Sequence, residues 1–132
     1  MRICLIGSAR FEDAFKSWNK ALTLAGHTVY SLAVYPSDED STREWYKESE
    51  KELLDLVHLN KILNSDAVVC IDSVRCPNEP APATHYVGES TRRELLWTRM
   101  QNKHLLYTTQ TKLADAHNLL KMTPRESFTE SL

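Results

Sequence analysis

The segment from Gly88 to Glu94 begins with a glycine, continues through two hydroxyl side chains and ends with the carboxylate of Glu94. Gly88 allows a sharp turn, and the N–H groups in the first turn of a following helix form a site for anionic groups. Ser90 or Thr91 is expected to cap this helix, with Glu94 at the same end. Thr91 and Glu94 also fit the spacing of a capping box, which opens many helices without a catalytic role. The segment therefore indicates either an anion site beside an acidic residue or an ordinary helix cap.

A second segment suited to anions follows the first apolar run of the chain. This run, at residues 3–6, ends at Gly7, and Ser8 and Arg10 stand where a helical pattern begins. Backbone N–H groups, a hydroxyl and a guanidinium all complement a phosphate. The segment lacks the Walker and G-x-G-x-x-G patterns, so ATP hydrolysis and Rossmann-type dinucleotide binding are poorly supported. We expect Gly7, Ser8 and Arg10 to bind an anionic group of a substrate.

Asp72 and His58 are candidate partners of Glu94. Asp72 ends a buried apolar run, and ligands of open α/β sheets gather at the carboxyl ends of strands. A carboxylate beside a bound sugar can attack the anomeric carbon, while a second group assists the leaving group or water. Each partner also has a structural interpretation, Asp72 as a strand-end cap and His58 as a helix-surface histidine. We interpret Glu94 as the nucleophile, with Asp72 or His58 as its partner.

Hydrophobic patterning predicts strands that alternate with helices. Strands are expected at 3–6, 27–32, 66–72 and 104–107, and helices at 11–25, 49–63 and from the Gly88 segment to 102. Such alternation implies right-handed βαβ units and a parallel sheet. The predicted fold class is therefore α/β, a flavodoxin-like or Rossmann-like three-layer sandwich. The apolar stripe expected to bury the second helix contains Leu53, Leu56, Val57, Asn60 and Leu63, widened by Leu54, Leu59 and Ile62.

Two loops and a tail complete the expected organisation. Residues 34–46 are acidic and turn-rich, and we expect an exposed loop that borders the pocket. Residues 73–87 contain three prolines and no periodicity, which predicts a lid or a substrate wall. One α/β domain is expected over residues 1–122, including a helical segment around 113–120. Residues 123–132 form a polar tail with a composition compatible with disorder.

Composition limits the classes of partner. The 132-residue chain has a formal net charge of −2, which suggests neither a nucleic-acid surface nor a membrane surface. Its three cysteines are an odd count and indicate a reducing, intracellular setting. Metal-binding C-x-x-C and H-x-x-x-H spacings are absent, so no metal and no cofactor are expected. The N-terminal apolar run is too short for a signal peptide or a membrane span, and we expect a cytoplasmic protein.

Three blocks, in their order and spacing over roughly residues 1–108, resemble the nucleoside 2-deoxyribosyltransferase superfamily. This superfamily includes the nucleoside 5'-monophosphate N-glycosidases. The blocks are Gly7-Ser8-Ala9-Arg10, then Leu56-Val57-His58-Leu59-Asn60-Lys61-Ile62 ahead of Ser65-Asp66-Ala67-Val68-Val69, and finally Gly88-Glu89-Ser90-Thr91-Arg92-Arg93-Glu94.

The resemblance implies a flavodoxin-like fold, cleavage of an N-glycosidic bond by a glutamate that matches Glu94, and homo-oligomers whose neighbours complete the site. In members that hydrolyse nucleotides, the Gly-Ser-x-Arg turn holds the 5'-phosphate, so the presence of Arg10 favours hydrolysis over base transfer. Hydroxyls at the helix start add phosphate or ribose contacts. The substrate-binding residues expected in this way are Gly7, Ser8, Arg10, Gly88, Ser90 and Thr91.

Two positions depart from the pattern of this superfamily. Many members have an aspartate where this chain has His58, so His58 or Asp72 would have to replace the second carboxylate. Members commonly have a tyrosine in the first strand that contacts the nucleophile, whereas the matching position here is Cys4. Tyr86 and Tyr107 are the candidates to replace it.

The sequence as a whole predicts hydrolysis of a (deoxy)nucleoside 5'-monophosphate to free base and sugar 5-phosphate. The alternatives are base exchange between deoxynucleosides and a catalytically silent nucleotide-binding module. The expected partners are a small-molecule nucleotide or nucleoside and further copies of the chain, in a homodimer or higher homo-oligomer. Neither a nucleic acid nor a membrane is expected as a partner.

Overall fold

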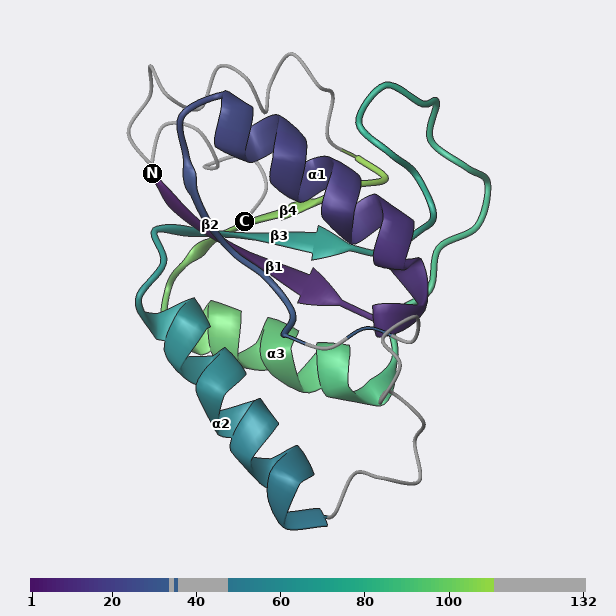
Figure 1. Ribbon diagram of the computed structural model, residues 1–132. Helices are drawn as coiled ribbons and strands as arrows, with labels where there is room; N and C mark the ends of the chain where they lie inside the picture. The colour runs from purple at the N-terminus through teal and green to yellow at the C-terminus, as the bar shows by residue number, and fades with distance from the viewer. Residues whose placement is uncertain (34, 36–47, 111–132) are drawn as a thin grey trace.

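A parallel β-sheet forms the centre of the computed structural model, which describes residues 1–33, 35 and 48–110 (Figure 1). In this part of the chain the strand order is β2-β1-β3-β4, and every pair of neighbours is parallel. The chain thus starts in the middle of the sheet and adds strands on either side. The strands are β1 (Arg2–Gly7), β2 (Thr28–Tyr30), β3 (Ala67–Ile71) and β4 (His104–Tyr107).

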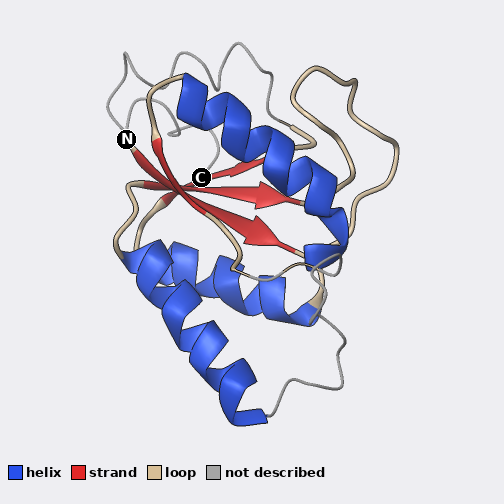
Figure 2. Ribbon diagram, viewed as in Figure 1, coloured by secondary structure: helices blue, strands red, loops and turns tan. Residues whose placement is uncertain are grey.

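Helices cover both faces of this sheet (Figure 2). A short 3-10 turn, η1 (Ala9–Phe11), leads into α1 (Glu12–Leu24) on one face. The opposite face is covered by α2 (Glu48–Leu63) and α3 (Glu89–Met100). Three layers with this strand order are the arrangement of flavodoxin-like folds, so the predicted fold class is confirmed.

Alternating side chains of β1 and β3 supply the core on the two faces. The apolar runs are continuous because a parallel sheet covered on both sides buries every residue of its inner strands. Ile3 and Leu5 pack toward α1, together with Phe15 and Trp18, whereas Cys4 packs on the opposite face. The α2 and α3 face also buries Ile6, Ile62, Val68, Cys70, Leu95 and Leu105.

The apolar stripe predicted to bury α2 is mostly not the buried side, and of its eight residues only Ile62 is fully buried. Leu53 and Leu56, expected in the core, are 59% and 61% exposed, and Val57 and Leu63 are also exposed. The face turned toward the sheet instead carries Ile62 and His58, both buried. Apolar residues lie on both sides of this helix, so their spacing alone did not identify the inner side. Because α2 is oriented in this way about its axis, His58 is buried.

The loop between β3 and α3 is tied to the body of the protein. Trp18 Nε1 donates to the carbonyl of Arg75 at 2.9 Å, and Arg75 in turn donates to the carbonyls of Glu79 and Thr108. At the end of the loop, the Tyr86 N–H donates to the carbonyl oxygen of Asp72 at 2.7 Å. These bonds favour a fixed wall over a mobile lid.

Other expectations concern parts of the chain outside the described residues. The acidic loop expected at 34–46 falls there except for Tyr35, as do the helical segment around 113–120 and the polar tail from 123. Among the described helices none is long and apolar enough to cross a membrane. The described residues also contain no group of three or more His, Cys, Asp or Glu side chains placed to hold a metal ion.

Candidate active site

The carboxyl ends of β1 and β3 meet at the edge of the sheet where η1 and α3 begin (Figure 1). Gly7 ends β1 and pairs with Ile71 at the end of β3. The φ angle of Gly7 is +143°, and a Cβ atom added there would lie 2.3 Å from the carbonyl oxygen of Ile71. Only glycine allows this approach. Between these two strand ends the order of the strands reverses, since β2 is added on one side of β1 and β3 on the other. Open α/β sheets bind ligands at such a topological switch point.

The turn after β1 presents Ser8 and Arg10 at this edge. Ser8 caps η1, because its Oγ accepts the N–H of Arg10 at 3.4 Å. The guanidinium of Arg10 lies over the ring of Tyr86, 3.8 Å from the ring centroid. Because Tyr86 comes from the loop before α3, this stack joins the two segments that the sequence singles out for anions.

The start of α3 differs from its predicted form. The helix begins at Glu89 with Gly88 as N-cap, and no side chain of a described residue caps it. The prediction that Ser90 or Thr91 caps the helix is therefore wrong. Gly88 is extended (φ −79°, ψ 177°) and leads directly into the helix, which places both hydroxyl residues inside the first turn. The first turn keeps its N–H groups and its positive dipole end without a side-chain cap.

Glu94 and His58 meet between α3 and α2. Glu94 Oε2 lies 3.1 Å from His58 Nε2, and both residues are 8% exposed. The two atoms are close enough for an ion pair but are not aligned as a hydrogen bond, and neither has another hydrogen-bond partner in the described structure. The interpretation of His58 as a surface histidine is therefore wrong. The sequence-predicted nucleophile and one of its two candidate partners form a buried pair.

The surroundings of Glu94 keep nearby thiols uncharged. Burial, assisted by the charge of Glu94 and opposed by Lys61, raises the pKa of Cys4 to about 12. Burial, followed by the charges of Asp72 and Glu94, likewise raises the pKa of Cys70. Cys4 thus lies as a neutral thiol near Glu94, at the strand position where members of the superfamily that the sequence resembles commonly have a tyrosine.

The two tyrosines considered as replacements are placed differently. Tyr86 lines the same cavity as Glu94, with its ring under Arg10. The hydroxyl of Tyr107 accepts a hydrogen bond from Arg99 at 3.0 Å, and Tyr107 is not part of the described cavity wall. Of the two, Tyr86 lies in the described cavity wall, where its hydroxyl lies against Gly88 and its contacts do not include Glu94.

A cavity of about 760 Å³ joins these elements. Its volume lies within the range of small-molecule sites, roughly 300–1,000 Å³. Its wall combines the two anion segments with the Glu94–His58 pair, so eight of the nine residues predicted for the site are brought together. These eight are Gly7, Ser8, Arg10, His58, Gly88, Ser90, Thr91 and Glu94.

Asp72 is the ninth predicted residue, and the structure does not bring it to the described wall of the cavity. It is 3% exposed, and its carboxylate accepts hydrogen bonds from Thr108 Oγ1 at 3.1 Å, Thr109 N at 3.2 Å and Thr109 Oγ1 at 2.7 Å. These bonds tie the end of β3 to the residues after β4. The geometry therefore favours the strand-end interpretation of Asp72.

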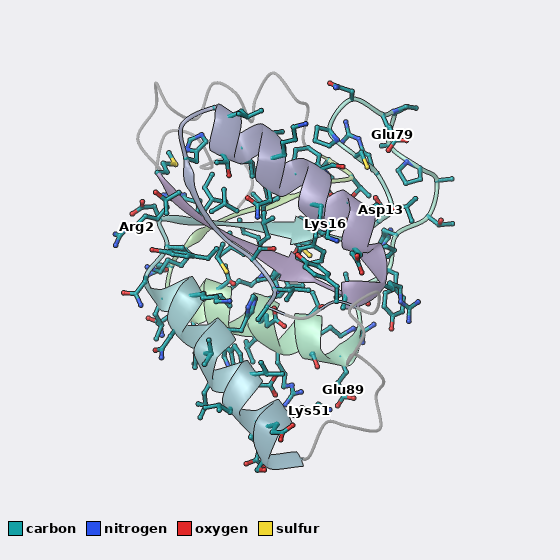
Figure 3. All side chains as sticks on the ribbon, viewed as in Figure 1. Arg2, Asp13, Lys16, Lys51, Glu79 and Glu89 are labelled. Atoms are coloured by element: carbon teal, nitrogen blue, oxygen red, sulfur yellow. The ribbon has the colours of Figure 1, made fainter. Side chains whose placement is uncertain are left out.

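Sequence reasoning missed three charged residues on the inner side of α2. Lys51, Asp55 and Lys61 line the cavity, and Lys61 also donates to the carbonyl of Ser31 at 2.7 Å. Figure 3 shows Lys51 on α2 and Glu89 at the start of α3, both of which belong to the cavity wall. Lys51, Asp55, His58 and Lys61 repeat at intervals of three and four, the spacing of one helix face. That polar spacing is the signal in the sequence that could have identified this side of α2 as facing the cavity.

Comparison with known proteins identified similar folds. No family model and no curated protein matches the chain. Among solved structures, the chain is similar to the CMP N-glycosidase BcmB of Clostridium botulinum, with a TM-score of 0.50 and 14% identity over 81% of this chain and 70% of that one. It also matches a 2-deoxyribosyltransferase of Bacillus psychrosaccharolyticus, with a TM-score of 0.47 and 18% identity over 81% of this chain and 71% of that one. At these identities the likeness to the first structure shows a shared fold.

Proposed function

We propose that the protein is an N-glycosidase of the nucleoside 2-deoxyribosyltransferase superfamily that hydrolyses a (deoxy)nucleoside 5'-monophosphate to free base and sugar 5-phosphate. The observation that carries this proposal is that Glu94, paired with His58, shares one cavity with the turn of Ser8 and Arg10. A nucleotide has an anionic end and an anomeric carbon, and this cavity offers groups suited to each. The fold shared with a CMP N-glycosidase supports the same assignment.

The phosphate would bind where η1 and α3 begin. Ser8 supplies a hydroxyl, Arg10 supplies in-plane N–H donors, and the uncapped first turn of α3 supplies backbone N–H groups. Ser90 and Thr91 belong to that turn and line the same cavity, so their hydroxyls would add contacts to the phosphate or the ribose. Binding of the phosphate would restrict the position of the sugar relative to Glu94, because only a few covalent bonds separate the phosphate from the sugar ring.

Glu94 would then act at the anomeric carbon. A carboxylate oxygen forms a bond to this carbon while the carbon–nitrogen bond breaks, and its electron pair leaves with the base. His58, 3.1 Å from Glu94, would position the carboxylate and, when protonated, give a proton to the leaving base. In a second step water would attack the same carbon and give a proton to His58 while the bond between this carbon and Glu94 breaks. This step releases the sugar phosphate and restores both Glu94 and the protonated His58.

Base release from a panel of nucleotides, followed by chromatography, tests the proposal. Glu94→Gln keeps the size of the side chain but removes its charge, so kcat should fall by roughly 1,000-fold or more if the carboxylate is the nucleophile. Glu89→Gln is the matched control, because Glu89 lies in the same helix and in the same cavity wall. Full activity of Glu94→Ala would contradict the assignment.

Two further measurements separate the alternatives. An added acceptor base yields a new nucleoside only if the protein transfers the sugar, whereas hydrolysis yields none. Tight nucleotide binding in calorimetry, without product after long incubation, would identify a silent binding module.

Sedimentation measures the homo-oligomer that the resemblance implies, and the exposed Leu53 and Leu56 of α2 are the residues to replace in that measurement.

A further inference from the structure

Tyr86 connects the two anion-binding segments of the cavity. Its ring face lies under the guanidinium of Arg10, and its edge meets the ring of Phe11 at a centroid distance of 6.3 Å and an interplanar angle of 72°. Its hydroxyl lies against Gly88, since a Cβ atom added to that glycine would be 3.2 Å from Tyr86 Oη. One side chain therefore touches the turn after β1 and the N-cap of α3.

The backbone of Tyr86 is held in place by a hydrogen bond. The N–H of Tyr86 donates to the carbonyl of Asp72 at 2.7 Å, directly beyond β3. Phe11, against which the ring edge packs, is only 9% exposed and belongs to the core on the α1 side. Tyr86 itself is 40% exposed and faces the cavity. Tyr86 is thus held by its backbone and by Phe11, and the face of its ring supports the guanidinium of Arg10, an arrangement called the Tyr86 platform below.

Arg10 depends on this platform for its orientation. The Arg10 side chain is exposed, and in the described part of the chain no acidic residue forms a salt bridge with it. Stacking holds a guanidinium through its flat face, and its in-plane N–H donors remain available to a ligand. A salt bridge would instead use those donors. The stack therefore orients Arg10 while keeping it able to bind a phosphate.

We infer that Tyr86 is a positioning residue that sets the preference of the cavity for phosphorylated over unphosphorylated substrates, through Arg10. This inference rests on the proposed function. Ordering a long side chain in advance removes part of the entropy cost of binding, and the benefit reaches only substrates that contact that side chain. Loss of the ring should therefore affect a nucleoside 5'-monophosphate and leave the matching nucleoside unaffected.

Tyr86→Leu and Tyr86→Phe are the informative variants. We expect Tyr86→Leu to raise KM for the nucleotide about three- to five-fold, as loss of an exposed cation–π contact implies, with kcat within about two-fold. KM for the nucleoside should not change. Tyr86→Phe keeps the ring face and should retain the wild-type preference. A purely structural role would alter both substrates alike and would lower kcat with the folded fraction.

A double-mutant cycle with Arg10→Ala shows whether the effect passes through Arg10. In the Arg10→Ala background, Tyr86→Leu should cause no further loss of nucleotide preference. The inference would be overturned if the two substitutions reduced the preference for the nucleotide additively, or if Tyr86→Leu left that preference unchanged. Either result could be obtained with an enzyme that still releases base, so it would not bear on the proposed function.

Failure of the proposed function gives a different result. If the wild type releases no base, the proposed hydrolysis is refuted, and calorimetry then compares binding of the nucleotide with binding of the nucleoside in the same variants. A wild-type preference for the nucleotide that Tyr86→Leu reduces would support the role of Tyr86 in a binding site. Equal binding of both compounds by the wild type would overturn the inference as well.

Discussion

Substitution of Asp72 separates a structural carboxylate from a catalytic one. The carboxylate is buried and accepts three hydrogen bonds, two at Oδ1 and one at Oδ2, from Thr108 and Thr109. Asp72→Asn keeps Oδ1 as an acceptor and presents an amide to the hydroxyl of Thr109, which can rotate to accept. Because mainly the charge of the acceptor is lost, we expect a destabilisation of about 1 kcal/mol.

Asp72→Ala removes both acceptor oxygens and with them all three hydrogen bonds. Each bond contributes about 1 kcal/mol, more for a charged acceptor, and the hydroxyl of the fully buried Thr108 loses its recorded partner. The expected cost is therefore about 3–5 kcal/mol, a large part of the stability of a typical domain. Thr109→Val, which removes the 2.7 Å bond from the other side, should cost about 1 kcal/mol and is the matched control.

Urea unfolding followed by circular dichroism measures these costs, and base release at saturating nucleotide measures kcat. In Asp72→Asn we expect kcat to stay within about three-fold of the wild type, since Asp72 is not part of the described cavity wall. A fall of roughly 100-fold or more in kcat, with an unchanged unfolding midpoint, would refute the structural assignment and restore Asp72 as a catalytic partner of Glu94.

Three further substitutions or treatments probe the surroundings of the site. Gly7→Ala should lower the unfolding free energy by at least about 2 kcal/mol in urea titrations, because the new Cβ would meet the carbonyl of Ile71 in a strained conformation. Burial raises the pKa of Asp66, but its hydrogen bonds to Arg2 and the charge of Arg2 outweigh burial, so the pKa lies below the usual 3.8. The stabilisation that the charged Asp66 provides is therefore present above pH 3.8 and is lost as pH falls through the lowered pKa. Acid unfolding of Asp66→Asn should therefore depend less on pH below about 5 than that of the wild type. Cys4, with a pKa of about 12 and no exposed surface, should resist iodoacetamide at pH 8 until urea unfolds the protein, as mass spectrometry can show.

The fold was predictable because its elements differ in period. Ile3 and its neighbours in β1 form an unbroken apolar run, as do the residues of β3 around Val68, and this pattern is typical of strands buried on both faces. Between them, α1 has a single apolar face that contains Phe15 and Trp18. Strand, helix and strand in succession allow few arrangements other than a right-handed parallel unit.

The candidate site was predictable in its composition but not in its pairing. The carboxyl edge of the sheet could be identified from strand ends, and Glu94 and Arg10, both assigned to that edge, line one cavity. Whether His58 or Asp72 would face Glu94 depended on the rotation of α2 and on the donors near β4, and neither is encoded locally. Thr108 and Thr109 engage Asp72 from 36 and 37 residues away. Such contacts follow only from the assembled sheet.

The cap of α3 illustrates a local competition that sequence rules do not decide. Thr91 and Glu94 have the spacing of a capping box with Thr91 as N-cap, yet the N-cap is Gly88, three residues earlier. The earlier start changes the chemistry of this end. A serine or threonine cap would occupy an N–H group of the first turn, whereas a glycine N-cap has no side chain with which to do so. An anion site and a strong cap compete for the same donors.

The distance between the phosphate segment and Glu94 is set mainly by the sheet. Ser8 and Arg10 follow β1 directly, while Glu94 lies on a helix that follows β3, and β1 and β3 are paired from Ile3 to Gly7. The close contact of Gly7 with Ile71 fixes the register at the end nearest the cavity. The relative position of the two segments that a nucleotide would span therefore follows from the pairing of β1 with β3. For this reason the effect of Gly7→Ala should extend beyond stability: kcat per folded molecule should fall as well, because the anomeric carbon would be displaced from Glu94 while the phosphate stayed bound.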